Sequence, residues 1–238
     1  MPLPDDFRTA TSDLAEVLDR REGPYGEAVL RRRGDRYEII ANGCFLMDTS
    51  DGCSERALVT AALDAFAEGS PGTAPRLLVG GLGVGFSLAQ AAADPRPRSV
   101  TVLEREQAVI DWHTAGDAPL ARFAGTGHRD PRVRIVHDDL LRHLAEDGSA
   151  GRYDVLCLDI DNGPDWTVTE SNDSLYGDAG LALLRRTLTD RGVLAVWSAA
   201  PSADFERRLA ARFRRVWSIE LAVEAERGLP DVVHLATR

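Results

Sequence analysis

Three acidic residues follow apolar segments that read as successive β-strands: Glu104 after VTVL, Asp138 after VRIVH and Asp159 after YDVLCL. The carboxyl ends of neighbouring parallel strands share one edge of a sheet, and ligands bind there. An acid about twenty residues after a glycine-rich turn accepts hydrogen bonds from both ribose hydroxyls, which suits Glu104. Asp138, with Asp139 beside it, suits the adenine amino group. The sequence therefore predicts a nucleoside site.

The glycine-rich turn is the segment LLVGGLGVGF, which runs from a strand into a helix. Its glycines permit a tight turn and a close approach of a ligand to the backbone, so we expect cofactor contacts at Gly80, Gly81, Gly83 and Gly85. No lysine of a triphosphate-binding loop follows. The dinucleotide-binding motif GxGxxG, if it began at Gly81, would need a third glycine at position 86, which is Phe86 here. An NAD-linked oxidoreductase remains an alternative hypothesis, but an acid at the third strand end favours an adenosine sulfonium over a dinucleotide as the ligand.

Short apolar strands alternate with amphipathic helices from residue 76 onward, which predicts a mostly parallel, twisted sheet with helices on both faces. We expect strands over 76–79, 100–103, 133–136, 153–158, 192–197, 216–221 and 232–236. Helices are expected over 86–93, from 107, 140–145, 179–188 and 204–213. Trp197 is assigned to the core. Residues 1–53 are predicted as an N-terminal helix and β-hairpin region, and residues 54–238 as a Rossmann-like catalytic domain.

Composition narrows the partners. The formal net charge of -10 disfavours nucleic acid and favours a small, cationic acceptor. The start of the chain lacks a basic region followed by an apolar core, and no stretch has the length of a membrane span. The three cysteines form neither a CxxC pair nor a metal motif, so we expect no metal and a cytoplasmic protein.

Together these segments resemble the spermidine synthase-like branch of the class I methyltransferase fold over nearly the whole chain. The glycine turn is similar to that family's GGGDGG, and YDVLCLDIDNGP is similar to its YDVIIxDSSDP. The resemblance implies a Rossmann-like fold, a cytoplasmic homodimer with contacts through the hairpin region, and Asp159 as the catalytic aspartate. It implies S-adenosylmethionine, or its decarboxylated form, as the donor.

Four positions depart from the family pattern. Gly83 replaces the aspartate of GGGDGG, and Asn162 aligns with the second aspartate of DSSDP, with Asp161 adjacent. Leu46 replaces a polyamine-facing glutamine, and Glu55 replaces a tyrosine. Because glycine stands where the family has an aspartate, position 83 no longer repels a donor that carries a carboxylate. This difference ranks methyl or larger alkyl transfer from intact S-adenosylmethionine ahead of true aminopropyl transfer.

An amine acceptor must lose a proton before it attacks the carbon beside the sulfonium. We expect Asp159 to orient the amine and take that proton, while Asp161 strengthens the negative field. A turn-capping role for Asp161 is the alternative. Further acceptor contacts are expected from side chains of the following loop and of a helix predicted to begin at Ser54: Asn162, Trp166, Tyr176 and Glu55. A homologue that binds the nucleoside without chemistry remains the third hypothesis.

Overall fold

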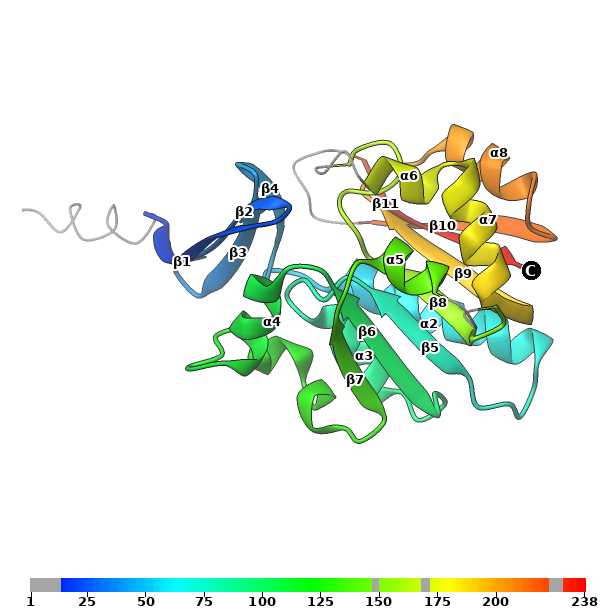
Figure 1. Cartoon of the computed structure of the whole chain (residues 1–238), viewed down its shortest axis with the longest axis horizontal. Coiled ribbons are helices and arrows are strands. Elements are labelled where there is room, and N and C mark those ends of the chain that lie inside the picture. Colours follow the sequence, from blue (N-terminus) through cyan, green and yellow to red (C-terminus); the bar gives the residue numbers. More distant parts are fainter. Residues whose placement is uncertain (1–13, 147–149, 168–171, 223–228) are drawn as a thin grey trace, which may run out of the picture.

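The computed structural model of the chain describes residues 14–146, 150–167, 172–222 and 229–238. An antiparallel four-stranded sheet comes first, in the order of the chain: β1 (Glu16–Gly23), β2 (Gly26–Arg33), β3 (Arg36–Ala41) and β4 (Cys44–Asp48). We call it the N-terminal sheet. Figure 1 shows it standing to one side of a larger body that contains the remaining elements.

A seven-stranded sheet forms the centre of the larger body, in the order β10-β11-β9-β8-β5-β6-β7. Its strands are β5 (Arg76–Gly80), β6 (Ser99–Glu104), β7 (Val133–His137), β8 (Tyr153–Leu158), β9 (Leu188–Ser198), β10 (Arg215–Leu221) and β11 (Asp231–Thr237). The pairs β5–β6, β6–β7, β5–β8 and β8–β9 are parallel, whereas β10 and β11 are antiparallel to their neighbours. The chain starts at β5 and builds outward on both sides, so β5 and β8 flank the switch point where such sheets bind ligands.

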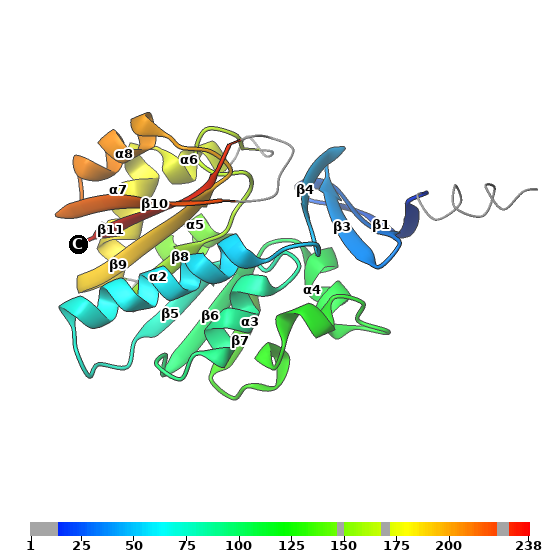
Figure 2. The same cartoon turned by 180° about the vertical axis from the view of Figure 1, so that it is seen from behind.

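Helices cover both faces of this sheet, as the alternating pattern predicts. Figure 2 shows α2 (Cys53–Gly69) and α3 (Phe86–Ala93) on one face, where α4 (Gln107–Thr114) and the 3₁₀ turns Ala121–Ala124 and Gly127–Arg129 also lie. Figure 1 shows the opposite face, which carries α5 (Leu140–Ala145), α6 (Asp173–Tyr176), α7 (Asp178–Thr187) and α8 (Ala203–Ala210). Consecutive strand residues such as Leu77 and Leu78 pack into the two hydrophobic cores on opposite faces of the sheet, because neighbouring side chains in a strand point to opposite faces.

The predicted α/β fold with a mostly parallel sheet is confirmed. Several local expectations differ from the structure, among them the strand expected over 192–197, which runs from Leu188 to Ser198. Helix α7 ends at Thr187, since Leu188 already pairs with Tyr153 as the first residue of β9. Helix α8 ends at Ala210, where the N–H groups of Arg212 and Phe213 both turn back to the Leu209 carbonyl. The strand Glu16–Gly23 was missed because nearly all of its residues are exposed and no apolar alternation marks it.

The expected N-terminal helix does not include Glu16–Gly23, and residues 1–13 lie outside the described part of the chain. The division between residues 53 and 54 stays a prediction. Across the described ranges, no helix is both long enough and apolar enough to cross a membrane.

Candidate active site

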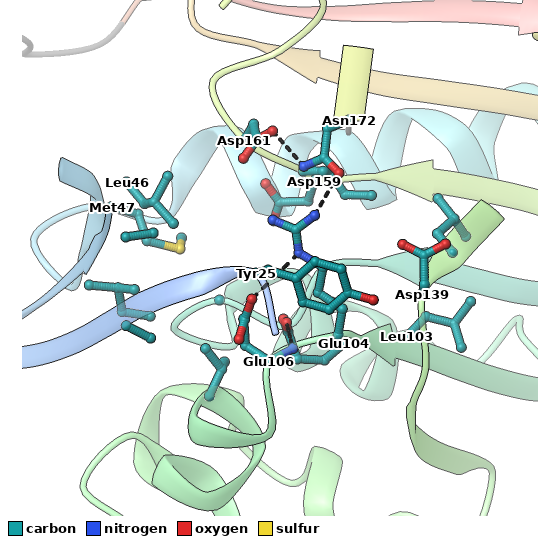
Figure 3. Close-up of a pocket in the computed structure, with 18 of the residues that line it drawn as sticks. Tyr25, Leu46, Met47, Leu103, Glu104, Glu106, Asp139, Asp159, Asp161 and Asn172 are labelled. Atoms are coloured by element: carbon teal, nitrogen blue, oxygen red, sulfur yellow. Dashed lines mark hydrogen bonds and ion pairs between the residues drawn. The ribbon is translucent and has the colours of Figure 1, made fainter. Parts of the chain in front are cut away.

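A cavity opens where the N-terminal sheet faces the carboxyl ends of the central strands. Its walls include Gly83 from the glycine turn, Glu104 after β6, Asp138 and Asp139 after β7, and Asp159 after β8. Figure 3 shows Asp159 between two groups of side chains, with Leu46 and Met47 on one side and Leu103 and Asp139 on the other. Acids that follow β6, β7 and β8 therefore meet in one cavity at the same edge of the sheet, as their spacing predicts.

The glycine turn packs tightly against the end of β8. Gly81 has a φ of 94°, and a Cβ there would lie 2.1 Å from the Asp159 carbonyl oxygen. Gly85 has a φ of 101°, and its Cβ would meet the His113 ring at 2.8 Å. These positions need glycine for the fold of the turn, and Gly80 is likewise enclosed by neighbouring side chains. Of the four glycines expected to contact a cofactor, the cavity walls include only Gly83.

Glu104 is held in position by the backbone. It is buried, and its two carboxylate oxygens accept hydrogen bonds from the N–H groups of Leu82 at 3.0 Å and Glu106 at 2.8 Å. A carboxylate has about four lone-pair sites, so each oxygen retains capacity for a second donor. The arrangement suits a pair of hydroxyl donors, as on a ribose.

Asp138 and Asp139 differ in how they are engaged. Burial would raise the pKa of Asp138, but hydrogen bonds from Arg142 Nε at 2.6 Å and from the Asp139 N–H at 2.8 Å hold it below the usual value. Asp139 caps α5 by accepting from the Arg142 N–H at 2.9 Å. Asp138, His143 and Glu146 could each offer one ligand atom to a metal ion, and these atoms lie within 4.8 Å of one another. The Asp138 carboxylate of this group is already paired with Arg142.

Asp159 and Glu55 form the most strongly perturbed acidic pair of the cavity. Desolvation raises the pKa of Asp159 to about 6, with Asp231 and Glu104 adding to the rise, while a 2.8 Å hydrogen bond from Ser87 Oγ opposes it. Desolvation and the charge of Asp159 raise the pKa of Glu55 to about 8. Like charges in a desolvated site resist simultaneous ionisation, so at neutral pH the pair retains a proton.

Asp161 belongs to a chain of contacts across the cavity. Asn172 donates to Asp161 Oδ2 at 2.5 Å, and Arg105 Nη1 donates to Asn172 Oδ1 at 2.8 Å. The Arg105 guanidinium lies 4.6 Å from the centre of the Tyr25 ring, and Nε lies 3.7 Å from Glu106 Oε1. Figure 3 shows Asp161, Asn172, Tyr25 and Glu106 gathered around Asp159. Arg105 was missed by sequence reasoning, although it directly follows the predicted strand-end acid.

Three of the four expected acceptor contacts lie away from the cavity walls. Tyr176 is fully buried, where its hydroxyl donates to the Ile160 carbonyl at 2.9 Å and its ring packs on Phe205. Trp166 is 55% exposed outside the cavity, and Asn162 is buried beside β9, with its carbonyl accepting from Ala199. The cavity walls thus include none of these three side chains, and their assignment as acceptor contacts stays a prediction. Glu55 alone of the four lines the cavity.

Trp197 packs against the hydrophobic core, as predicted, and in addition lines the cavity from β9. Tyr25 and Trp197 could not be found by strand-end reasoning. Tyr25 comes from the β1–β2 turn of the other sheet, and Trp197 lies within a strand that reads as buried.

Comparisons with known proteins agree on one architecture. No model of a protein family matches the chain. A polyamine aminopropyltransferase of Shewanella oneidensis is 28% identical over 134 residues, which cover 52% of this chain and 22% of that protein, so the match spans about a fifth of the relative's length. A spermidine synthase solved with the transition-state analogue AdoDATO has a TM-score of 0.72 at 15% identity, covering 93% of this chain and 73% of its own. Spermidine synthase from Thermotoga maritima gives 0.70 at 15% identity, with coverages of 93% and 72%.

Proposed function

Starting from the spermidine synthase-like fold of the chain, we propose an enzyme that transfers an alkyl group from an adenosyl sulfonium donor to an amine. The observation that carries this proposal is the meeting of Glu104, Asp138 and Asp159 around one cavity beside Gly83. Each acid follows a different parallel strand, and together they offer acceptors for a ribose, an adenine amino group and an ammonium.

The adenosine half of the donor is assigned to two acids. Glu104, already oriented by two backbone N–H groups, accepts from the ribose hydroxyls. Asp138, held ionised by Arg142, accepts from the adenine amino group. Preformed acceptors lower the cost of ordering the site when the ligand binds.

The reacting half is assigned to Asp159 and Glu55. The acceptor ammonium gives a proton to Asp159, and the neutral nitrogen attacks the carbon bonded to sulfur. The new C–N bond forms as the C–S bond breaks, and the electron pair of that bond leaves with sulfur as a neutral thioether. Near-attack geometry supplies most of the rate enhancement in such a displacement, and a base with a pKa near neutrality adds to it. The raised pKa of Asp159, about 6, suits this role.

The relatives favour aminopropyl transfer from decarboxylated S-adenosylmethionine, which reverses the ranking drawn from the sequence. Methyl transfer from intact S-adenosylmethionine is the second candidate. One contact supports it: a Cβ at Gly83 would meet Met47 Sδ at 2.4 Å, so the thioether fills the space where an aspartate of the glycine turn would begin.

The test is calorimetry with both donors, followed by mass spectrometry of the products formed with a panel of amines. The proposal expects binding of at least one donor and transfer of its alkyl group. Asp159→Asn should retain donor affinity within about threefold and lose at least a hundredfold in kcat. Donor binding without transfer to any amine would favour a nucleoside-binding homologue. NAD binding without sulfonium binding would remove the transferase proposal.

A further inference from the structure

Most of the side chains that the N-terminal sheet contributes to the cavity are apolar. These apolar side chains come from strands β2, β3 and β4, and they are Ala28, Ile39, Ala41, Leu46 and Met47. Ile39 is 2% exposed, and Leu46 and Met47 pack against the same hydrophobic core. This surface, which we call the apolar wall, is therefore continuous with the interior of the protein.

The polar residues of the N-terminal sheet that reach the cavity are engaged by their own neighbours. Glu27 forms an ion pair with Arg20. Asn42 accepts from the Glu27 N–H at 3.0 Å and donates to the Tyr25 carbonyl at 3.2 Å. The Tyr25 ring lies against the Arg105 guanidinium. The carboxylate that this sheet contributes to the cavity, that of Glu27, is therefore already paired with a guanidinium.

Met47 extends the apolar wall to the glycine turn. Its sulfur lies 2.4 Å from the position that a Cβ on Gly83 would take, and Gly83 has a φ of 49°, a conformation that L side chains rarely adopt. An acidic side chain at Gly83 would have to displace Met47. Glycine and methionine together keep this end of the cavity uncharged.

Asp159 lies between the apolar wall and the strand-end acids assigned to adenosine. Figure 3 shows Leu46 and Met47 across Asp159 from Leu103 and Asp139. A nucleophile that approaches Asp159 from the side away from the adenosine therefore has its remaining atoms against Leu46 and Met47. The two acids near the nucleophile, Asp159 and Glu55, come from β8 and α2 rather than from this wall.

We propose that the acceptor carries one amine at Asp159 and an apolar body on the apolar wall, so that the site selects hydrophobic monoamines over diamines and polyamines. This inference rests on the proposed function and specifies its substrate class. A second ammonium placed against Leu46 and Met47 would lose hydration against apolar side chains, and the carboxylate that the N-terminal sheet brings to the cavity, Glu27, is already paired with Arg20. Each added methylene would instead remove apolar surface from water and raise kcat/KM about fourfold.

The experiment compares 1-aminobutane with 1,4-diaminobutane as acceptors for whichever donor binds, together with a series of longer 1-aminoalkanes. The expected kcat/KM ratio favours the monoamine by at least tenfold and rises along the series. Equal rates, or a preference for the diamine, would overturn the inference while leaving the proposed transferase intact. Failure to bind either donor would instead count against the proposed function.

A matched pair of variants tests the wall itself. Leu46→Gln should reduce the monoamine preference at least fivefold, because an amide offers polar partners to a distal ammonium. Phe45→Gln is the control, since Phe45 is 49% exposed and is not among the residues that line the cavity. An unchanged preference in Leu46→Gln, with folding verified by thermal denaturation, would contradict the proposal.

Binding supplies a readout that does not need turnover. The same two amines are titrated into the protein saturated with 5′-methylthioadenosine. Tighter binding of 1-aminobutane supports the inference, and tighter or equal binding of 1,4-diaminobutane overturns it.

Discussion

Replacing Glu55 with glutamine should stabilise the protein at alkaline pH and have little effect in acid. Burial and the charge of Asp159 raise the pKa of Glu55 from its usual 4.5 to about 8. Asp231 and Asp51 contribute further negative charge, and the Ser54 hydroxyl beside Glu55 in the chain is bound to Asp231 at 2.6 Å. The folded protein thus retains a proton that the unfolded chain releases.

The sign follows from proton linkage. Between the two pKa values the folded state binds more protons than the unfolded state, so the free energy of unfolding falls as pH rises through this window. Glutamine does not titrate, and the variant avoids this loss. From pH 5 to pH 9 the free energy of unfolding of Glu55→Gln should rise relative to that of the unmodified protein by about 4 kcal/mol.

The assay is urea denaturation of both proteins at pH 5, 7 and 9. Glu68→Gln is the control: Glu68 lies exposed near the other end of α2, so this change should stay within about 0.5 kcal/mol at each pH. A difference between Glu55→Gln and the unmodified protein that stays constant within about 1 kcal/mol from pH 5 to pH 9 would show that Glu55 is not desolvated beside Asp159.

Three further predictions follow from single contacts. Ser87→Ala removes the 2.8 Å hydrogen bond to Asp159, so the acidic limb of the kcat/KM profile should move to higher pH by up to about one unit. Glu104→Gln should weaken binding of 5′-methylthioadenosine about 10- to 100-fold by calorimetry, and unchanged affinity would remove Glu104 from the ribose site. Gly83→Ala should cost about 1–3 kcal/mol of stability, because its Cβ would lie 2.4 Å from Met47 Sδ. A double-mutant cycle with Met47→Ala should recover part of that cost, and strict additivity would show that the two positions do not contact each other.

The strand-end acids could be predicted because they depend on local sequence. Each follows an apolar run, and the parallel arrangement of those runs brings Glu104, Asp138 and Asp159 to one edge. The same reasoning found the glycine turn, although it assigned ligand contacts to Gly81 and Gly85, which serve backbone packing.

Contacts between distant segments could not be predicted in this way. Arg105 meets Tyr25 and Asn172 only because the β1–β2 turn and the start of α6 come together at the cavity. Tyr176 carries a hydroxyl in a segment that the sequence predicts as a loop, but it ends helix α6 and is buried against Ile160 and Phe205. A loop residue's type does not reveal which way its side chain turns.

The central claim is that adenosine binds against the glycine turn, between Glu104 and Asp138. A crystal structure of the protein with 5′-methylthioadenosine tests it most directly. The account predicts both ribose hydroxyls within hydrogen-bond distance of the Glu104 carboxylate and the adenine amino group facing Asp138. A nucleoside bound elsewhere, or one whose ribose does not contact Glu104, would contradict it.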